Sequence, residues 1–156
     1  MKKNLLVCVM ALAAVFALTG CKKGNNGGET TTTQPAEKKL SCSLSNGGNT
    51  SRITFTYEGN DVKKATMSIT EKQKDEKTAK SEYEKAVKEM PEVNKNKGVS
   101  MSASYSGTLV TGTYSFTIAD MDDAAKILYD EVFEEFKNKD YDAVKTALTD
   151  AGYKCN

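Results

Sequence analysis

Apolar side chains recur at every second position along five stretches of the chain, and this alternation constrains the fold more than any other feature. The stretches are residues 40–44, 53–57, 65–69, 99–105 and 110–118. Side chains of a β-strand point alternately to the two faces of a sheet, so each stretch predicts a strand that buries one face. Glycine, serine and asparagine residues stand between several of these stretches and indicate tight turns. The sequence therefore predicts antiparallel hairpins that share one buried face.

The hairpin of residues 99–118 can be given a register from the sequence alone. A two-residue turn at Gly107-Thr108 places every apolar side chain of both strands on the same face. The pairs that this turn predicts are Tyr105 with Val110, Ala103 with Gly112, Met101 with Tyr114, and Val99 with Phe116.

The hairpin of residues 53–69 does not fit such a simple turn. A two-residue turn at Gly59-Asn60 would pair the apolar Phe55 with the charged Lys64. The sequence instead predicts a register that pairs apolar residues, with a longer loop or a bulge near residues 60–63. The predicted pairs are Ile53 with Ile69, Phe55 with Met67, and Tyr57 with Ala65.

Three other segments have helical spacing. Residues 75–90 carry an apolar stripe, and Pro91 is expected to end that helix. A second helix is predicted over about residues 124–136 and a third from Tyr141 to Ala151, just before a glycine. Together with the hairpins, these segments predict an α+β fold, in which an antiparallel sheet of five to six strands carries two to three helices on one face.

The N-terminal residues have the organisation of a bacterial lipoprotein signal peptide. Two lysines follow Met1, and residues 5–18 contain no charged side chain. This apolar run is long enough for a signal peptide but shorter than the roughly 20 residues of a membrane-spanning helix. The following Leu18-Thr19-Gly20-Cys21 resembles a lipobox, so we expect cleavage before Cys21 and attachment of diacylglycerol to its thiol. An ordinary signal peptide cut near an incidental cysteine is the alternative.

A lipid on Cys21 predicts a protein anchored to the extracytoplasmic side of the cell membrane, because two acyl chains give a stable anchor. Residues 1–20 would be the removed signal peptide. Residues 21–39 are rich in Gly, Asn, Thr and Lys, so they cannot bury a core and are predicted to be a disordered tether after the lipidated cysteine. Residues 40–156 are predicted to form a single domain.

The four cysteines of the chain reduce to one candidate disulfide. Cys8 leaves with the signal peptide and Cys21 is used by the lipid. Cys42 and Cys155 remain, in a compartment where disulfides persist, so we expect them to be bonded to each other. Two buried free thiols are the alternative.

Charge and residue usage argue against several classes of function. Removal of Lys2 and Lys3 with the signal peptide leaves 22 − 2 = 20 basic side chains against 21 acidic ones, a balance that argues against nucleic-acid binding. The chain has no histidine, which excludes His-based triads and zinc–histidine sites. It has no tryptophan for stacking sugars and no glycine-rich phosphate loop after a strand. We therefore predict no catalytic residue and no cofactor.

The acidic segment of residues 120–123 can be interpreted in two ways. It could begin a calcium-binding loop, or it could cap the helix predicted to follow it. An EF-hand loop needs an oxygen ligand where Ala124 stands and a glycine after it. Capping is the preferred interpretation, because acidic residues accept hydrogen bonds from the free N–H groups of a helix start. No metal site is predicted.

Several short segments, in their order along the chain, resemble the YehR-like lipoproteins, small bacterial lipoproteins with a domain of unknown function. The resemblance covers roughly residues 40–155 as well as the lipobox cysteine, Cys21. Its motifs are Phe55–Lys64, Lys97-Gly98-Val99 and Leu148–Lys154. It implies helices packed on an antiparallel sheet, and it implies no catalytic residue because the function of that family is unassigned.

The expected function is that of a non-enzymatic binding or interaction module held at the membrane by the lipid on Cys21. Its ligand could be an envelope protein, a peptide or a small solute. An inhibitor of an extracellular hydrolase, such as a protease or a lysozyme, is the first alternative, with a protruding loop at Ser45–Ser51 as its contact. An enzyme that uses a pair of carboxylates is the second alternative.

Overall fold

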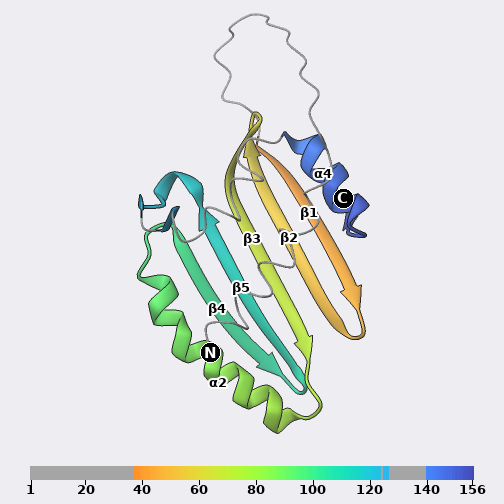
Figure 1. Ribbon diagram of the computed structural model, residues 1–156, viewed down its shortest axis with the longest axis vertical. Helices are drawn as coiled ribbons and strands as arrows, with labels where there is room; N and C mark the ends of the chain where they lie inside the picture. Colours follow the sequence, from red (N-terminus) through yellow and green to blue (C-terminus); the bar gives the residue numbers. More distant parts are fainter. Residues whose placement is uncertain (1–36, 124, 127–139) are drawn as a thin grey trace, which may run out of the picture.

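The computed structural model describes residues 37–156 except residue 124 and residues 127–139 (Figure 1). The described elements are β1 (Glu37–Asn46), β2 (Asn49–Glu58), β3 (Asp61–Lys72), α2 (Glu76–Asn94), β4 (Val99–Ser106), β5 (Leu109–Thr117), the short 3-10 helix η1 (Ile118–Asp120), α4 (Tyr141–Asp150) and β6 (Lys154–Cys155). The first strand begins at Glu37, so residues 37–39, which were expected to end the tether, pair with β2 instead.

The strands form one antiparallel sheet in the order β4-β5-β3-β2-β1-β6. Helix α2 lies along β4 at one side of the sheet, and α4 lies beside β1 at the other (Figure 1). Side chains of both helices pack against the same apolar cluster of the sheet. The predicted α+β fold, with an antiparallel sheet and helices on one face, is therefore confirmed.

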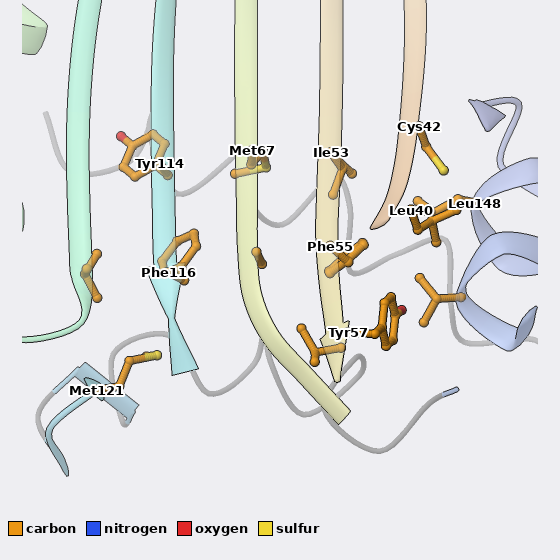
Figure 2. Packing of buried hydrophobic residues seen from close by; sticks show 14 of the residues in the cluster. Leu40, Cys42, Ile53, Phe55, Tyr57, Met67, Tyr114, Phe116, Met121 and Leu148 are labelled. Atoms are coloured by element: carbon orange, nitrogen blue, oxygen red, sulfur yellow. The ribbon is translucent and has the colours of Figure 1, made fainter. Parts of the chain in front are cut away.

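The hydrophobic core lies between this face of the sheet and the helices. Near α4, Leu40, Phe55 and Tyr57 of the sheet meet Leu148 of the helix (Figure 2). Each of these side chains is at most 1% exposed, as is Val144, one turn before Leu148. Burial of one such side chain stabilises a fold by about 1.5–3 kcal/mol, so this cluster fixes α4 against β1 and β2.

The hairpin of β4 and β5 has the register that the sequence predicts. Val99 pairs with Phe116, and Tyr105 pairs with Val110, on either side of the turn at Gly107-Thr108. Gly107 has a positive φ of 56°, which a glycine adopts without strain. Turn and apolar pattern agree here, so the prediction is confirmed.

The register predicted for β2 and β3 is wrong by two residues. Ile53 pairs with Met67 and Phe55 with Ala65, where Ile69 and Met67 were expected. The turn does consist of Gly59-Asn60, with Glu58 opposite Asp61. The register then shifts between Thr56 and Tyr57, which leaves Lys63 without an opposite residue. The bulge predicted near residues 60–63 is therefore confirmed, at Lys63. This one extra residue in β3 turns the apolar side chains to the buried face, so no longer loop is needed.

Helix α2 extends further than expected, because Pro91 does not end it. The helix continues through Pro91 to Asn94, and the backbone N–H of Lys95 donates to the Pro91 carbonyl at 3.2 Å. Proline cannot donate to the carbonyl of Val87. Val87 is 38% exposed, on the solvent side of the helix, where water can replace the missing donor. At the other end, Asp75 caps the helix by accepting from the Thr78 N–H at 2.7 Å, and this bond lowers the pKa of the Asp75 carboxyl.

The last residue of α2 also contacts the outer edge of the sheet. The side-chain amide of Asn94 donates to the carbonyl of Met101 at 3.1 Å, and its oxygen accepts from the Met101 N–H at 2.5 Å. Both backbone groups of Met101 that face away from β5 are therefore satisfied by one side chain.

Helix α4 was predicted within one residue of its end. It runs from Tyr141 to Asp150, and Asp140 caps it by accepting from the Ala143 N–H at 2.8 Å. Gly152 follows with a φ of 87°, as expected for a residue just after a helix. Most of the helix predicted over residues 124–136 lies outside the described residues.

Candidate functional site

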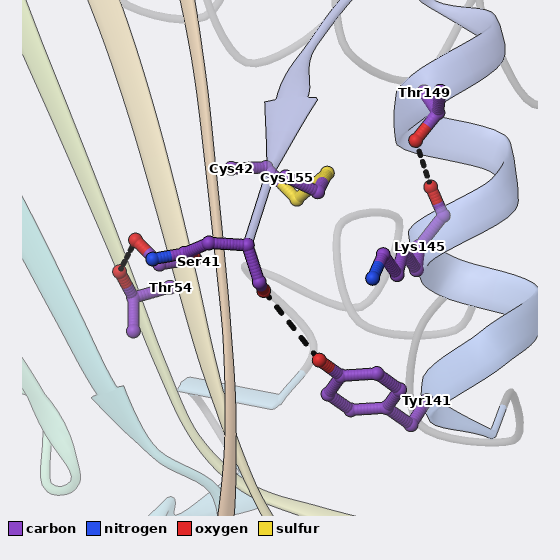
Figure 3. Close-up of a disulfide and its surroundings, with 8 residues drawn as sticks. Ser41, Cys42, Thr54, Tyr141, Lys145, Thr149 and Cys155 are labelled. Atoms are coloured by element: carbon purple, nitrogen blue, oxygen red, sulfur yellow. Dashed lines mark hydrogen bonds between the residues drawn. A yellow bond between two sulfur atoms is a disulfide. The ribbon is translucent and has the colours of Figure 1, made fainter.

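Cys42 and Cys155 form the predicted disulfide (Figure 3). They stand opposite each other in β1 and β6, with 4.1 Å between their Cα atoms. The pairing continues beyond the bond, because the Asn156 N–H donates to the Ser41 carbonyl at 3.1 Å. The disulfide therefore holds the C-terminal end of the chain in the sheet, where it has a structural role.

The predicted lipid site, Cys21, lies outside the described residues, as do the signal peptide and most of the tether. Among the described residues, no helix is both long and apolar enough to span a membrane.

The acidic segment before residue 124 acts as a helix cap. Asp122 accepts from the Ala125 N–H at 2.8 Å through one carboxylate oxygen, and from the Lys97 N–H at 3.4 Å through the other. Within the described ranges, no group of three or more Asp, Glu, Cys or His side chains is arranged to hold a metal ion. The capping interpretation of this segment is confirmed.

The segment Ser45–Ser51 is a tight hairpin and not a long loop. Its strands continue to Asn46 and Asn49, which pair with each other, so only Gly47 and Gly48 form the turn. The side-chain oxygen of Asn49 also accepts from the Lys72 N–H at 2.9 Å. The loop predicted at Ser45–Ser51 is therefore reduced to a two-residue turn between paired strands.

One tyrosine in the core has a strongly perturbed environment. Tyr57 is 0% exposed, and its ring packs edge-on against Tyr141 with 5.7 Å between the ring centroids. Its hydroxyl forms no hydrogen bond with any described residue. Burial, followed by the nearby negative charge of Asp140, raises the pKa of Tyr57 well above its ordinary value. The phenol stays protonated at neutral pH, so it cannot act as a base or a nucleophile.

The face of the sheet opposite the core is the most distinctive surface of the described structure. In its three central rows, the outward positions are occupied almost entirely by serine and threonine, aligned across the strands. We call it the hydroxyl face. Three rows cross five strands from β1 to β4 and consist of Ser41, Thr54, Thr66, Ser115 and Ser100, then Ser43, Arg52, Ser68, Thr113 and Ser102, then Ser45, Thr50, Thr70, Thr111 and Ser104.

Hydrogen bonds between neighbouring strands organise these hydroxyl groups. Between β3 and β5, Thr70 bonds to Thr111 at 2.9 Å and Ser68 bonds to Thr113 at 3.1 Å. Three further hydroxyl pairs lie 3.2–3.4 Å apart, namely Ser41 with Thr54, Ser45 with Thr50, and Thr66 with Ser115. Each pair has two O–H groups and uses one of them, so a donor and several lone pairs remain available to another molecule.

Both described helices lie on the other side of the sheet. Figure 3 shows the Ser41–Thr54 pair on the side of β1 that faces away from α4, whereas the neighbouring Cys42 points toward that helix. The three rows contain one charged residue, Arg52, in the middle row, which Lys154 of β6 extends beyond Ser43.

Other charged residues lie in the outer rows of the face. The row next to that of Ser41 contains Lys64, between Thr56 and Thr117, and Lys39, opposite Thr56. Glu37 and Glu58 pair with each other at the ends of β1 and β2, and Lys72 lies at the end of β3.

The sequence contained a signal for this surface that the search for catalytic motifs missed. Charged residues make up 28% of the chain, yet residues 41–45, 66–70, 100–104 and 111–117 contain none. Serine and threonine occupy the alternate positions between the apolar residues of all four segments. A strand with a solvated face can carry any polar residue there. The uniform choice of short hydroxyl side chains could therefore have been recognised before the structure was known.

Comparisons with solved structures identify two proteins that share the fold of this chain. An NMR structure of a protein from Streptococcus pneumoniae TIGR4 superposes with a TM-score of 0.60 at 17% sequence identity, over 88% of this chain and 98% of that one. The NMR structure of the E. coli YehR protein superposes with a TM-score of 0.56, also at 17% identity, over 78% of this chain and 91% of that one. This chain has a YehR-like fold. No protein-family model and no curated protein sequence matches it.

Proposed function

We propose that this protein is a lipoprotein of the YehR-like family, anchored through Cys21 on the extracytoplasmic side of the cell membrane, where it acts as a non-enzymatic binding module. The hydroxyl face is the binding surface. The observation that supports this proposal is the ordered array of serine and threonine side chains, which neither described helix covers. The described residues offer no assembled catalytic group that favours the enzyme alternative, and the tight turn at Gly47-Gly48 does not favour the inhibitor alternative.

The anchor has a direct test. The variant Cys21→Ser should accumulate as unprocessed precursor and should take up no labelled fatty acid, because the thiol that carries the lipid is gone. The matched control is Cys8→Ser, which removes a cysteine from the signal peptide and should be processed and labelled normally. Normal labelling of Cys21→Ser would refute the lipoprotein assignment.

The binding surface is tested by comparing three forms of the full chain as bait in an envelope extract. The double variant Thr54→Glu/Thr113→Glu puts two carboxylates on the hydroxyl face, and Ser81→Glu puts one on the exposed side of α2. Wild type and Ser81→Glu should retain the same material above a mock bait. The double variant should retain at least about tenfold less, because its two carboxylates would be buried at the interface without partners. Equal retention by all three would contradict binding through this face, and no retention by wild type would contradict the binding module.

A further inference from the structure

We infer that the hydroxyl face binds an anionic, polyhydroxylated polymer of the cell envelope, a chain of sugar or polyol units that carries phosphate or carboxylate groups. This inference rests on the proposed function, because it names the class of ligand for the same surface. Its grounds are the charge of the face, the groups it offers for hydrogen bonding and the kinds of contact it lacks.

The hydroxyl face carries more cations than carboxylates. At its margin, Lys39 contacts Glu37 at 3.3 Å. Arg52, Lys64 and Lys154 are all exposed, and none forms a salt bridge with any described residue. The carboxylates at the β2–β3 turn, Glu58 and Asp61, contact Lys63 instead, at 3.8 and 3.5 Å. The three hydroxyl rows contain no acidic residue. The face therefore presents cations that an anionic ligand can neutralise.

The cations are spread across the sheet and not gathered at one point. Neighbouring strands lie about 4.8 Å apart and alternate residues of a strand about 6.7 Å apart. By that geometry, the Cα atoms of Arg52 and Lys64, one strand and two rows apart, are separated by roughly 14 Å, and those of Arg52 and Lys154, two strands apart, by roughly 10 Å. A ligand that meets all three must be extended and must carry charge at intervals. A polymer meets this condition and a single small anion does not.

The hydroxyl groups specify a ligand with hydrogen-bonding groups along its length. Serine and threonine both donate and accept, so they can bond to the hydroxyl groups of a sugar or polyol as well as to its anionic oxygens. Between Arg52 and Lys64 the array continues without a break through Thr54 and Thr66. Cations and hydroxyls together therefore match a polymer that alternates charged and hydroxyl-bearing units.

The contacts that the face lacks argue against a protein or a lipid bilayer as its ligand. Protein interfaces depend on buried aromatic and large apolar anchors. Insertion into a membrane surface likewise needs apolar side chains. None of the residues in the three hydroxyl rows is aromatic or a large aliphatic residue. Leu109, which is 40% exposed, lies at the margin of the face, opposite Lys72 and Ser106, and a single leucine there does not make an apolar anchor site. A second copy of this chain is also disfavoured, because it would bring the same cations face to face.

The test titrates the full chain, held in a polyoxyethylene detergent, with poly(glycerol phosphate), a polymer of hydroxyl and phosphate groups. Backbone amide NMR signals report which residues respond. We expect saturable changes in β2, β3 and β5 at outward positions. Dextran supplies hydroxyls without charge, and inorganic polyphosphate supplies charge without hydroxyls. Both should bind at least about tenfold more weakly than poly(glycerol phosphate).

Variants separate the two kinds of contact. The double variant Arg52→Gln/Lys64→Gln should weaken binding about 25-fold, at roughly fivefold for each cation. Thr54→Val/Thr113→Val keeps shape and β-propensity while removing two hydroxyls, and should weaken binding about fivefold or more. Lys77→Gln/Lys80→Gln on α2 removes two exposed cations from a helix, and its affinity should equal that of wild type.

Four outcomes would overturn the inference. Equal affinity for polyphosphate, with no effect of the valine variant, would show charge attraction alone. Signal changes that appear only when phosphatidylglycerol is added to the detergent would indicate a lipid surface. Loss of binding in the α2 control would place the site elsewhere. If no probe binds but the bait experiment still succeeds, the polymer is rejected and the binding module stands. If both experiments fail, the binding module is rejected as well.

Discussion

The two faces of the sheet are built on the same strands and differ in almost every physical property. The inner face carries Phe55, Tyr57 and Met67, which are at most 7% exposed, while their chain neighbours Thr54, Thr56 and Ser68 point outward. The inner side chains are large and irregular in shape, and the helices fill the space around them. The outer ones are small and nearly uniform. Stability therefore depends on the inner face, and the outer face is free to be shaped by a ligand.

The largest expected difference between the two faces is the loss of stability caused by a cavity in the inner face. Phe55→Ala should lower the free energy of unfolding by about 3–5 kcal/mol, because it removes a buried ring beside α4. Its neighbour on the other face, changed by Thr54→Val, should alter the same quantity by no more than about 0.5 kcal/mol. Urea denaturation followed by circular dichroism measures both. If the two variants lost equal stability, the hydroxyl face would have to be part of the structural core.

The disulfide is the next test, because it attaches the C-terminal end of the chain to the inner face. Its cysteines are separated by 113 residues, so the bond closes a long loop in the unfolded chain. The double variant Cys42→Ser/Cys155→Ser should lose about 2–4 kcal/mol of unfolding free energy.

Wild-type protein treated with a reducing agent serves as the control for that variant, and it should unfold at the same urea concentration. An unchanged midpoint in both samples would mean that the closing strand and α4 hold the terminus without the bond.

The smallest expected effect concerns a buried polar atom of the inner face, the Tyr57 hydroxyl, which has no hydrogen-bond partner among the described residues. Burial raises the pKa of Tyr57, so the folded protein keeps this phenol neutral at a pH where the unfolded chain ionises it, near 10. The contribution of the neutral Tyr57 phenol to the free energy of unfolding is therefore fully present below pH 10. It is lost as the pH rises toward the raised pKa of the folded state.

Tyr57→Phe removes this ionisation. At neutral pH it should be as stable as wild type or more stable by about 1 kcal/mol, because a buried hydroxyl without a partner costs free energy. Above pH 10 its advantage should grow by up to about 1.4 kcal/mol per pH unit. Tyr105→Phe, at a site that is 37% exposed, is the control and should not gain this advantage. A Tyr57→Phe variant that is less stable at all pH values would show that the hydroxyl has a partner after all.

The sequence was most informative where a local turn and a long pattern agree. At the β4–β5 hairpin, Gly107 and the alternation from Val99 to Phe116 require the same register, so it could be predicted fully. At the β2–β3 hairpin, turn and pattern conflict, and a single extra residue at Lys63 resolves the conflict. The bulge was predicted near its observed position, but the register beyond it was not, because that depends on how the strands pack on both faces, which one strand's sequence does not contain.

The candidate site illustrates a different limit. Cys42 and Cys155 could be paired by elimination, since few cysteines remained. The hydroxyl face could not be assembled in the same way, because its rows join residues such as Ser41 and Ser100 that only the order of strands brings into line. Its members are visible in the sequence, but their alignment is a property of the folded sheet.

The contact between Asn94 and Met101 has a consequence for how copies of this protein behave side by side. An unpaired strand at the margin of a sheet can act as a template for pairing with another chain. The amide of Asn94 occupies the outward N–H and C=O of Met101 just as a neighbouring strand would. A second molecule therefore cannot pair with Met101 at the β4 edge of the sheet without first displacing that side chain.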